Sequence, residues 1–336
     1  MVWAGHAIRP GLLTRRSRLG RFIARRLLQA IPTLFGIILI TFLLSRLSPA
    51  DPVTLMVGDS FRVSESERAA LRETLGLNDP LPIQFVRFLG QVIVLDFGNS
   101  FYYHRPAIEM IGERIPNSLQ LSAAALVLGL VIGVPLGLLA AIYRGRLPDH
   151  LIRFFSVLGH AIPTFWFGLL FVLLLGVQTH VFPIGSMNAL GKDGDILDRL
   201  WHMVGPVLTL ALAPISNYPR FLRTEVLEVL SQDYVRTAHS KGLQNRVVIG
   251  VHVLRNALIP IVTLLGGVLT IVLGGSVIVE QIFNWPGLGR LLFEALNNKD
   301  YPLVQASVVI GSMLLIASYI LRDIVYALVD PRIKVR

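Results

Sequence analysis

Long apolar stretches separated by shorter polar ones make up most of this chain. With a window of about 19 residues, six stretches are long enough to cross the hydrocarbon core of a bilayer. They cover residues 27–47, 118–143, 154–179, 200–219, 256–279 and 301–321. The pattern therefore predicts an all-α polytopic membrane protein with six transmembrane helices.

Two apolar segments need separate treatment. The stretch 200–219 contains Pro206 and Pro214, so we expect a kinked helix whose freed carbonyl groups are satisfied by neighbouring helices. The segment 83–97 is apolar but short, and Arg87 interrupts it. We therefore expect it to lie on the surface or pack against other helices rather than to cross the membrane.

The polar loop between the first two spans, residues 48–117, is long enough to fold. Ser64 and Glu67 have the spacing of a capping box that would start a helix, and Gly76 is placed to end it in the left-handed conformation. The loop therefore predicts a small external subdomain between helices 1 and 2.

Composition and charge support a membrane location. Hydrophobic residues make up 53% of the chain and charged residues 15%, and the mean hydropathy of +0.63 is too high for a soluble domain of this length. The net charge of +10 is scattered between apolar spans, which argues against nucleic-acid binding. The lipid bilayer is therefore the expected surrounding.

The distribution of lysine and arginine predicts the orientation. Basic residues gather in the N-terminal segment 1–26, in 144–153, in 220–255 and in the tail 322–336, whereas the outer segments 180–199 and 280–300 hold few. By the positive-inside rule both termini are cytoplasmic. The run TRRSRLG at 14–20 loosely resembles a twin-arginine export signal, but the apolar stretch after it spans a full bilayer, which favours a retained first helix.

Several kinds of chemistry are absent from the sequence. The chain has no cysteine, no zinc-protease H-E-x-x-H and no Walker A pattern, and its only Gly-Lys pair, Gly191–Lys192, continues into aspartate. Glu280 and Asp323 lie only near span ends. These features argue against an intramembrane enzyme and against an ATP-independent secondary transporter, which often places carboxylates at mid-membrane.

The basic stretch 231–260, SQDYVRTAHSKGLQNRVVIGVHVLRNALIP, interrupts two apolar spans. Each of its charged residues would cost about 2.5–3.5 kcal/mol at the centre of a span, so the segment 220–255 is expected in the cytoplasm. Small residues at Ala238 and Gly242 suit a short docking helix that another surface approaches closely. From the spacing alone, a solvated basic loop remains an alternative.

Several motifs in this chain resemble one family in the same order. They are FIARRLLQAIPTLFGIILITFLLSRLSPADP, LGLNDPLPIQFVRFLGQ, DFGNSF, RIPNSLQLSAAALVLGLVIGVPLGLLAA, DYVRTAHSKGL with RNALIP, EQIFNWPGLGRLLFEALNNKDYPLVQA and LVDPRIK. Together they resemble permeases of ABC transporters, in the dipeptide/oligopeptide importer branch, with a dipeptide-permease B-like subunit as the nearest type. Arg236–Thr237–Ala238 stands where the generic importer motif has Glu-Ala-Ala.

The resemblance implies a type I ABC importer permease fold and ATP-driven uptake of short peptides across the bacterial plasma (inner) membrane. The implied partners are a second homologous permease, two cytoplasmic ABC ATPases and an extracytoplasmic substrate-binding protein. ATP and Mg²⁺ would be bound by the ATPases, so this chain would hold no cofactor, metal or catalytic residue and would not itself be an enzyme. The residues implied in ATPase coupling are Asp233, Tyr234, Arg236, Thr237, Ala238, Lys241, Gly242 and Leu243.

The substrate pathway is less well defined by the sequence. Candidate residues are Gly267, Gly275 and Ser276 in the fifth span and Glu280 at its outer end, where a peptide amino terminus could bind. Small residues in a span usually serve helix packing, which is the alternative. The same family branch includes importers of nickel chelates and other small solutes, but the eight histidines show no ligand-like spacing, which favours peptides.

Overall fold

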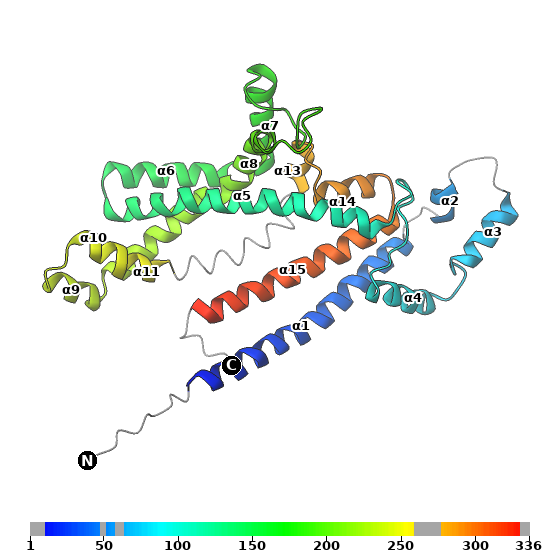
Figure 1. Cartoon of the computed structure of the whole chain (residues 1–336), viewed down its shortest axis with the longest axis horizontal. Helices are drawn as coiled ribbons and strands as arrows, with labels where there is room; N and C mark the ends of the chain where they lie inside the picture. The colour runs from blue at the N-terminus through cyan, green and yellow to red at the C-terminus, as the bar shows by residue number, and fades with distance from the viewer. Residues whose placement is uncertain (1–10, 48–51, 58–63, 259–276, 330–336) are drawn as a thin grey trace, which may run out of the picture.

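The computed structural model describes residues 11–47, 52–57, 64–258 and 277–329, and these form helices joined by turns, without a strand. The all-α expectation is therefore confirmed for this part of the chain. The long helices α1, α5, α8 and α15 run roughly along one direction, with α9 to α11 at one end of the molecule and α2 to α4 at the other (Figure 1).

The first and last long helices lie against each other. α1 (Gly11–Leu47) continues from the basic N-terminal segment through the expected first span, and α15 (Tyr301–Val329) extends beyond the expected last one. The two pack side by side (Figure 1). At the end where α1 begins, Arg26 Nε lies 2.9 Å from an Asp323 carboxylate oxygen, so an ion pair also joins the two helices.

A second pair, α5 (Ala107–Ile142) and α8 (Ile196–Leu230), forms the most extensive helix contact. Three glycines at four-residue spacing on α5, Gly129, Gly133 and Gly137, face Pro214, Tyr218 and Leu222 at the same spacing on α8. A Cβ added at any of these glycines would lie 2.8 Å from a carbon of α8. Glycine has no side chain at these three positions, so the two backbones can approach closely, as small residues allow between membrane helices.

Helix boundaries depart from the expected spans at several places. α5 begins within the loop 48–117, and α8 runs into the segment 220–255. α8 is continuous although it contains Pro206, Pro214 and Pro219. Both helices are therefore longer than the predicted spans, because a transmembrane helix can continue beyond the hydrocarbon core of the bilayer.

The stretch 154–179, expected as one span, forms two helices instead. α6 (Leu147–Ala161) and α7 (Thr164–Phe171), which continues into the π-helical segment Val172–Gln178, are bent by 94° at Ile162 and Pro163. Proline disfavours helical backbone in the residue before it, and Ile162 accordingly has extended backbone angles. Hydropathy alone could not locate this break.

Short helices connect the long ones at the end opposite α9. They are α2 (Pro52–Val57), α3 (Glu65–Thr74), α4 (Leu81–Ile93), α13 (Val277–Ile282) and α14 (Leu288–Asn297). The capping box on α3 is confirmed: the Glu67 backbone N–H donates to Ser64 Oγ, and the Ser64 N–H donates to Glu67. The hydrogen bonds that the Ser64 N–H and the Ser64 hydroxyl donate to the Glu67 carboxylate lower the pKa of Glu67. Gly76 has φ +62°, so its left-handed role is confirmed as well.

The segment 83–97 behaves as expected, because α4 packs against α1 rather than forming a long span. Phe88 and Val92 of α4 are buried, and Phe85 and Phe88 contact the Phe42 ring of α1. Buried residues of α1, α4, α5, α14 and α15 form one apolar core at this end of the molecule.

Four helices in the described residues are long and apolar enough to cross a membrane. They are α1 over Ile23–Leu47, α5, α8, and α15 over Tyr301–Ile324, and the bent α6–α7 pair would be a fifth. Most of the expected span 256–279 lies outside the described residues. The chain is therefore a multi-pass helical membrane protein, and six spans remain a prediction.

The arrangement of the ends gives a direct test of topology. Ser64 and Ser231 are exposed at opposite ends of the helices, and the chain has no cysteine that would interfere with labelling. We expect Ser64→Cys to react with a membrane-impermeant thiol reagent on intact cells, and Ser231→Cys to react only after permeabilisation. The reverse pattern would show that the orientation is inverted.

Candidate functional site

Residues 233–257, where ATPase coupling is expected, are called the coupling segment. They form a compact helical cap at the ends of α5 and α8 that are expected in the cytoplasm. α9 (Asp233–Ser240) follows α8 after one turn, and α10 (Asn245–Val247), the π-helical segment Val248–Val253 and α11 (Leu254–Ala257) complete it. A short helix was expected here and is present, and its role in docking a partner stays a prediction.

Gly242 ends α9 in the left-handed conformation, with φ +75°. Its backbone N–H donates to the His239 carbonyl at 2.9 Å, and the Leu243 N–H donates to the Ala238 carbonyl at 3.4 Å. These two bonds form a Schellman motif, in which glycine is preferred because a Cβ strains this conformation. No other atom lies within 4 Å of where that Cβ would be, so in this chain the conformation, not crowding, requires the glycine.

One face of α9 packs inward. Val235 and Ala238 are buried in a core with Ala141 of α5, Leu222 and Val226 of α8, and Val248, Val253 and Ala257 of the segment itself. Ala238 was expected to let a partner approach. Its side chain instead faces the chain's own core, because Val235 and Ala238 lie three residues apart on the same side of the helix.

The other coupling residues lie on the opposite, open face. Seven of the eight residues that the resemblance implies in ATPase coupling are exposed, and most of them are polar or charged. These seven, Asp233, Tyr234, Arg236, Thr237, Lys241, Gly242 and Leu243, are called the open α9 face. Tyr234 and Leu243 are the large apolar members, 45% and 40% exposed. Tyrosine and arginine are enriched at protein interfaces, so Tyr234 and Arg236 are the members of this face most typical of an interface.

Charges on the open α9 face are only weakly engaged within the chain. Arg236 Nη1 lies 3.6 Å from Asp233 Oδ1, and both side chains are largely exposed. Exposed pairs of this kind contribute little to stability. The Thr237 hydroxyl donates to the Asp233 carbonyl at 2.9 Å, so its hydrogen bond stays within α9.

A buried ion pair ties α6 to α8 beside this cap. Asp149, at the start of α6, is fully buried and accepts from Arg223 Nε at 2.7 Å and from Arg223 Nη2 at 2.9 Å. It also accepts from the Gly145 backbone N–H at 2.9 Å. Sequence reasoning did not single out this pair, because partners 74 positions apart give no local pattern. The bidentate contact joins α6 to α8, and the Gly145 hydrogen bond adds the α5–α6 loop to this unit.

Glu280, a candidate pathway residue, lies inside the protein. Its carboxylate accepts from the Ser118 hydroxyl at 2.6 Å and from the Arg290 backbone N–H at 2.9 Å, and the residue is fully buried. The Ser118 oxygen in turn accepts from the Leu288 N–H at 2.8 Å. In this structure the carboxylate holds the α13–α14 turn against α5 and is not open to a peptide amino group.

Gly267, Gly275 and Ser276 lie outside the described residues. The structure therefore brings together the coupling residues but not the pathway residues. His160, the ionisable group inside the expected third span, lies in the last turn of α6. No group of three or more potential metal ligands occurs among the described residues.

Comparison with known proteins identifies related sequences along nearly the whole chain. The family described as "Binding-protein-dependent transport system inner membrane component" matches residues 133–335, and the corresponding N-terminal family matches residues 19–122. The oligopeptide transport system permease protein AppB of Bacillus subtilis is 40% identical over 93% of this chain and 99% of that protein. The dipeptide transport system permease protein DppB of Escherichia coli K12 is 36% identical over 94% and 98%.

Among solved structures, an inward-facing form of the MetNI methionine ABC transporter is similar. Its TM-score is 0.49 at 16% sequence identity, covering 66% of this chain and 97% of that chain.

Proposed function

Because this chain belongs to the family of inner-membrane components of binding-protein-dependent transport systems, and is a permease of the peptide ABC-transporter type, we propose that it imports short peptides through a pathway shared with a second permease. Two separate ATPases would dock on the open α9 face, and a substrate-binding protein would deliver the peptide outside. The proposed architecture is the six-span type I permease, with both termini in the cytoplasm.

The observation that carries the proposal is the two-sided construction of α9. One side is anchored through Val235 and Ala238 to the core of α5 and α8, while the other side is open and mixed in character. A helix built in this way can transmit a push from a partner to the spans beneath it. A passive basic loop would need no such anchor.

The Asp149–Arg223 pair extends this lever. Because Arg223 on α8 holds Asp149 at the start of α6 through two hydrogen bonds, α6 would move with α8 and α9. Closure of the ATPases on ATP would then rock these helices together, as in rigid-body switching of domains. The differential contacts of the ATPases in the open and closed states would supply the driving free energy.

The alternative is an importer of nickel chelates or another small solute by the same mechanism. The described residues offer no metal-ligand cluster, but a permease can pass a chelate without binding the metal. An ATP-independent secondary transporter is the less favoured alternative. Asp149 and Glu280, fully buried, are both engaged by hydrogen bonds within the chain, which leaves neither as an evident proton or ion site.

Reconstitution of the assembly tests the proposal. Proteoliposomes containing both permeases, the ATPases and the binding protein should take up labelled di-, tri- or longer peptides when ATP is supplied, and should not do so with ADP. A nickel chelate is offered in parallel. Uptake of the chelate with no peptide signal at any length would reject the peptide substrate, and peptide uptake without ATPases would reject the coupling.

A further inference from the structure

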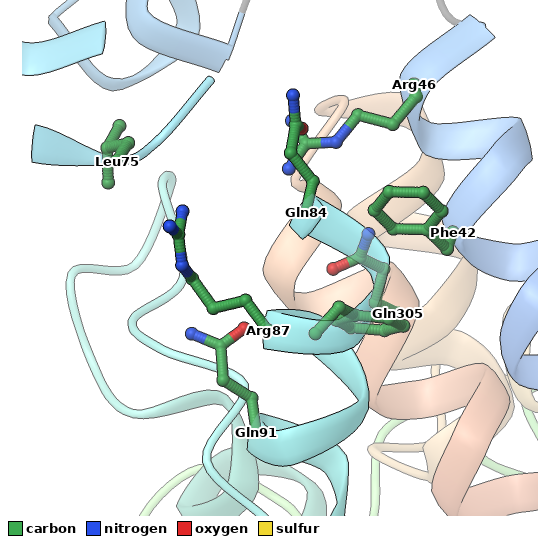
Figure 2. A pocket seen from close by; sticks show the side chains of 8 residues that line it. Phe42, Arg46, Leu75, Gln84, Arg87, Gln91 and Gln305 are labelled. Carbon is green, nitrogen blue, oxygen red and sulfur yellow. The ribbon is translucent and has the colours of Figure 1, made fainter. Parts of the chain in front are cut away.

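A small polar cavity lies where α1, α4 and α15 meet, at the end opposite α9. Its volume is about 90 Å³, and its polar lining consists of Arg46, Gln84, Arg87, Gln91 and Gln305 (Figure 2). It shares Arg46, Gln91 and Gln305 with a neighbouring hollow of about 320 Å³ lined by α2, α4 and the start of α15. Neither hollow belongs to the coupling segment.

Arg46 brings a positive charge that nothing in the described residues neutralises. Its guanidinium lies 5.5 Å from the centre of the Phe42 ring, one turn earlier on α1. Its Nε is buried and has no hydrogen-bond partner, and no ion pair forms between Arg46 and a described carboxylate. A buried donor on a charged group is costly to leave unmet, so the arrangement favours an anion at this position.

The surrounding amides hold the cavity in shape. Gln84 is 7% exposed and donates from Nε2 to the Leu77 and Asp79 carbonyls at 3.0 and 2.7 Å. These bonds fix its orientation and leave Oε1 buried, without a partner among the described residues, in the side chain that lines the same cavity as Arg46 (Figure 2). Gln305 Nε2 donates to Ser45 Oγ at 2.7 Å. Arg87 is already paired with Asp79 at 2.7 Å, so Arg46 carries the cavity's net charge.

The position of Arg46 indicates where the anion comes from. Arg46 lies in the last turn of the apolar span Ile23–Leu47, at the depth of lipid headgroups. Leu43 and Leu47, three residues before Arg46 and one after it on α1, are 38% and 78% exposed, and Leu81 of α4, three residues before Gln84, is 53% exposed. These exposed side chains provide a surface for acyl chains next to a polar cavity.

We propose that this cavity binds the phosphate of a membrane phospholipid, with Arg46 as the principal contact. The phosphate oxygens would accept from the Arg46 guanidinium, and the acyl chains would lie against the outer parts of α1 and α4. An arginine fork suits phosphate geometry. The bound lipid would join α4 to the first and last spans, independently of which solute the transporter carries.

Lipid retention by the purified transporter tests the proposal. Native mass spectrometry of the assembled complex, titrated with phosphatidylglycerol, should show a retained lipid whose affinity falls about 10-fold in Arg46→Gln. Gln305→Glu should weaken it too, because the new carboxylate would occupy the anion position from within the chain. Arg105→Gln is the matched control. Arg105 pairs with Glu113 on the exposed surface, so this substitution removes an equal charge outside the cavity.

Elution as a single assembled species, with its ATPases attached, shows that each variant is folded. Wild-type lipid retention in both Arg46→Gln and Gln305→Glu would overturn the proposal. The proposal would also fail if inorganic phosphate or a tripeptide bound in an Arg46-dependent way while phosphatidylglycerol retention did not depend on Arg46. A phosphate-free glycolipid retained as tightly as phosphatidylglycerol would reject phosphate as the recognised group.

Discussion

Replacing Gly137 with leucine is expected to abolish most of the folded protein. A Cβ at this position would lie 2.8 Å from Leu222 Cβ and 3.0 Å from the Pro219 carbonyl oxygen. Backbone atoms cannot move aside as a flexible side chain can, so α5 and α8 would have to separate along their contact. Overpacking of a tight interior costs about 1–3 kcal/mol, and we expect the upper end of that range here.

The measurement is the yield and melting temperature of detergent-solubilised protein, followed by fluorescence-detected size exclusion. Gly112→Leu is the matched control, because Gly112 lies on the same helix with no atom within 4 Å of its added Cβ. The control should elute and melt like the wild type. Equal melting temperatures for Gly137→Leu and the wild type would mean that the close α5–α8 contact is not required.

Replacing Gly242 with valine is expected to abolish ATP-driven uptake while leaving the chain inserted in the membrane. Valine is strained at φ +75°, by about 1–3 kcal/mol, and the strain is relieved if the last turn of α9 unwinds. Unwinding would displace Lys241 and Leu243 on the open α9 face. Gly242→Asn should keep most of the activity, because asparagine tolerates the left-handed conformation best among residues with a side chain.

Uptake into proteoliposomes and copurification of the ATPases measure the two consequences separately. Gly191→Val is the control, since Gly191 also has a positive φ, of +78°, with no atom within 4 Å of an added Cβ, but lies in the loop before α8 and away from α9. It should retain ATPase binding. Normal uptake and normal ATPase association in Gly242→Val would show that the open α9 face is not the docking surface.

Hydropathy predicted the helical class and the approximate places of the long helices, because each long apolar run is a local property of the sequence. The capping box at Ser64 and the left-handed glycines at 76 and 242 were predictable for the same reason. The bend between α6 and α7 was not predicted, although Pro163 marks it, because a window of 19 residues averages over a two-residue break.

Features that depend on distant contacts could not be read from spacing. Ala238 faces inward because of residues on α5 and α8, and Glu280 is buried because Ser118, 162 positions earlier, reaches it. A carboxylate at the end of a span can bind a ligand or can accept hydrogen bonds from the protein itself, and only its neighbours in the structure distinguish the two roles. The residues implied in coupling, by contrast, all lie between Asp233 and Leu243, so most of them share one surface on a short helix and the turn after it.

Within the part of the chain that the structure describes, the core beneath the open α9 face is formed by residues between Leu130 and Leu258. α1 differs in this respect, because the long helix packed against it, α15, is the last helix of the described chain. During synthesis the support for α9 is therefore complete in sequence before α13, α14 and α15 have been made. The α1–α15 pair, in contrast, can form only after all the other described helices have been made, so α1 must remain in the membrane without this partner until α15 is synthesised.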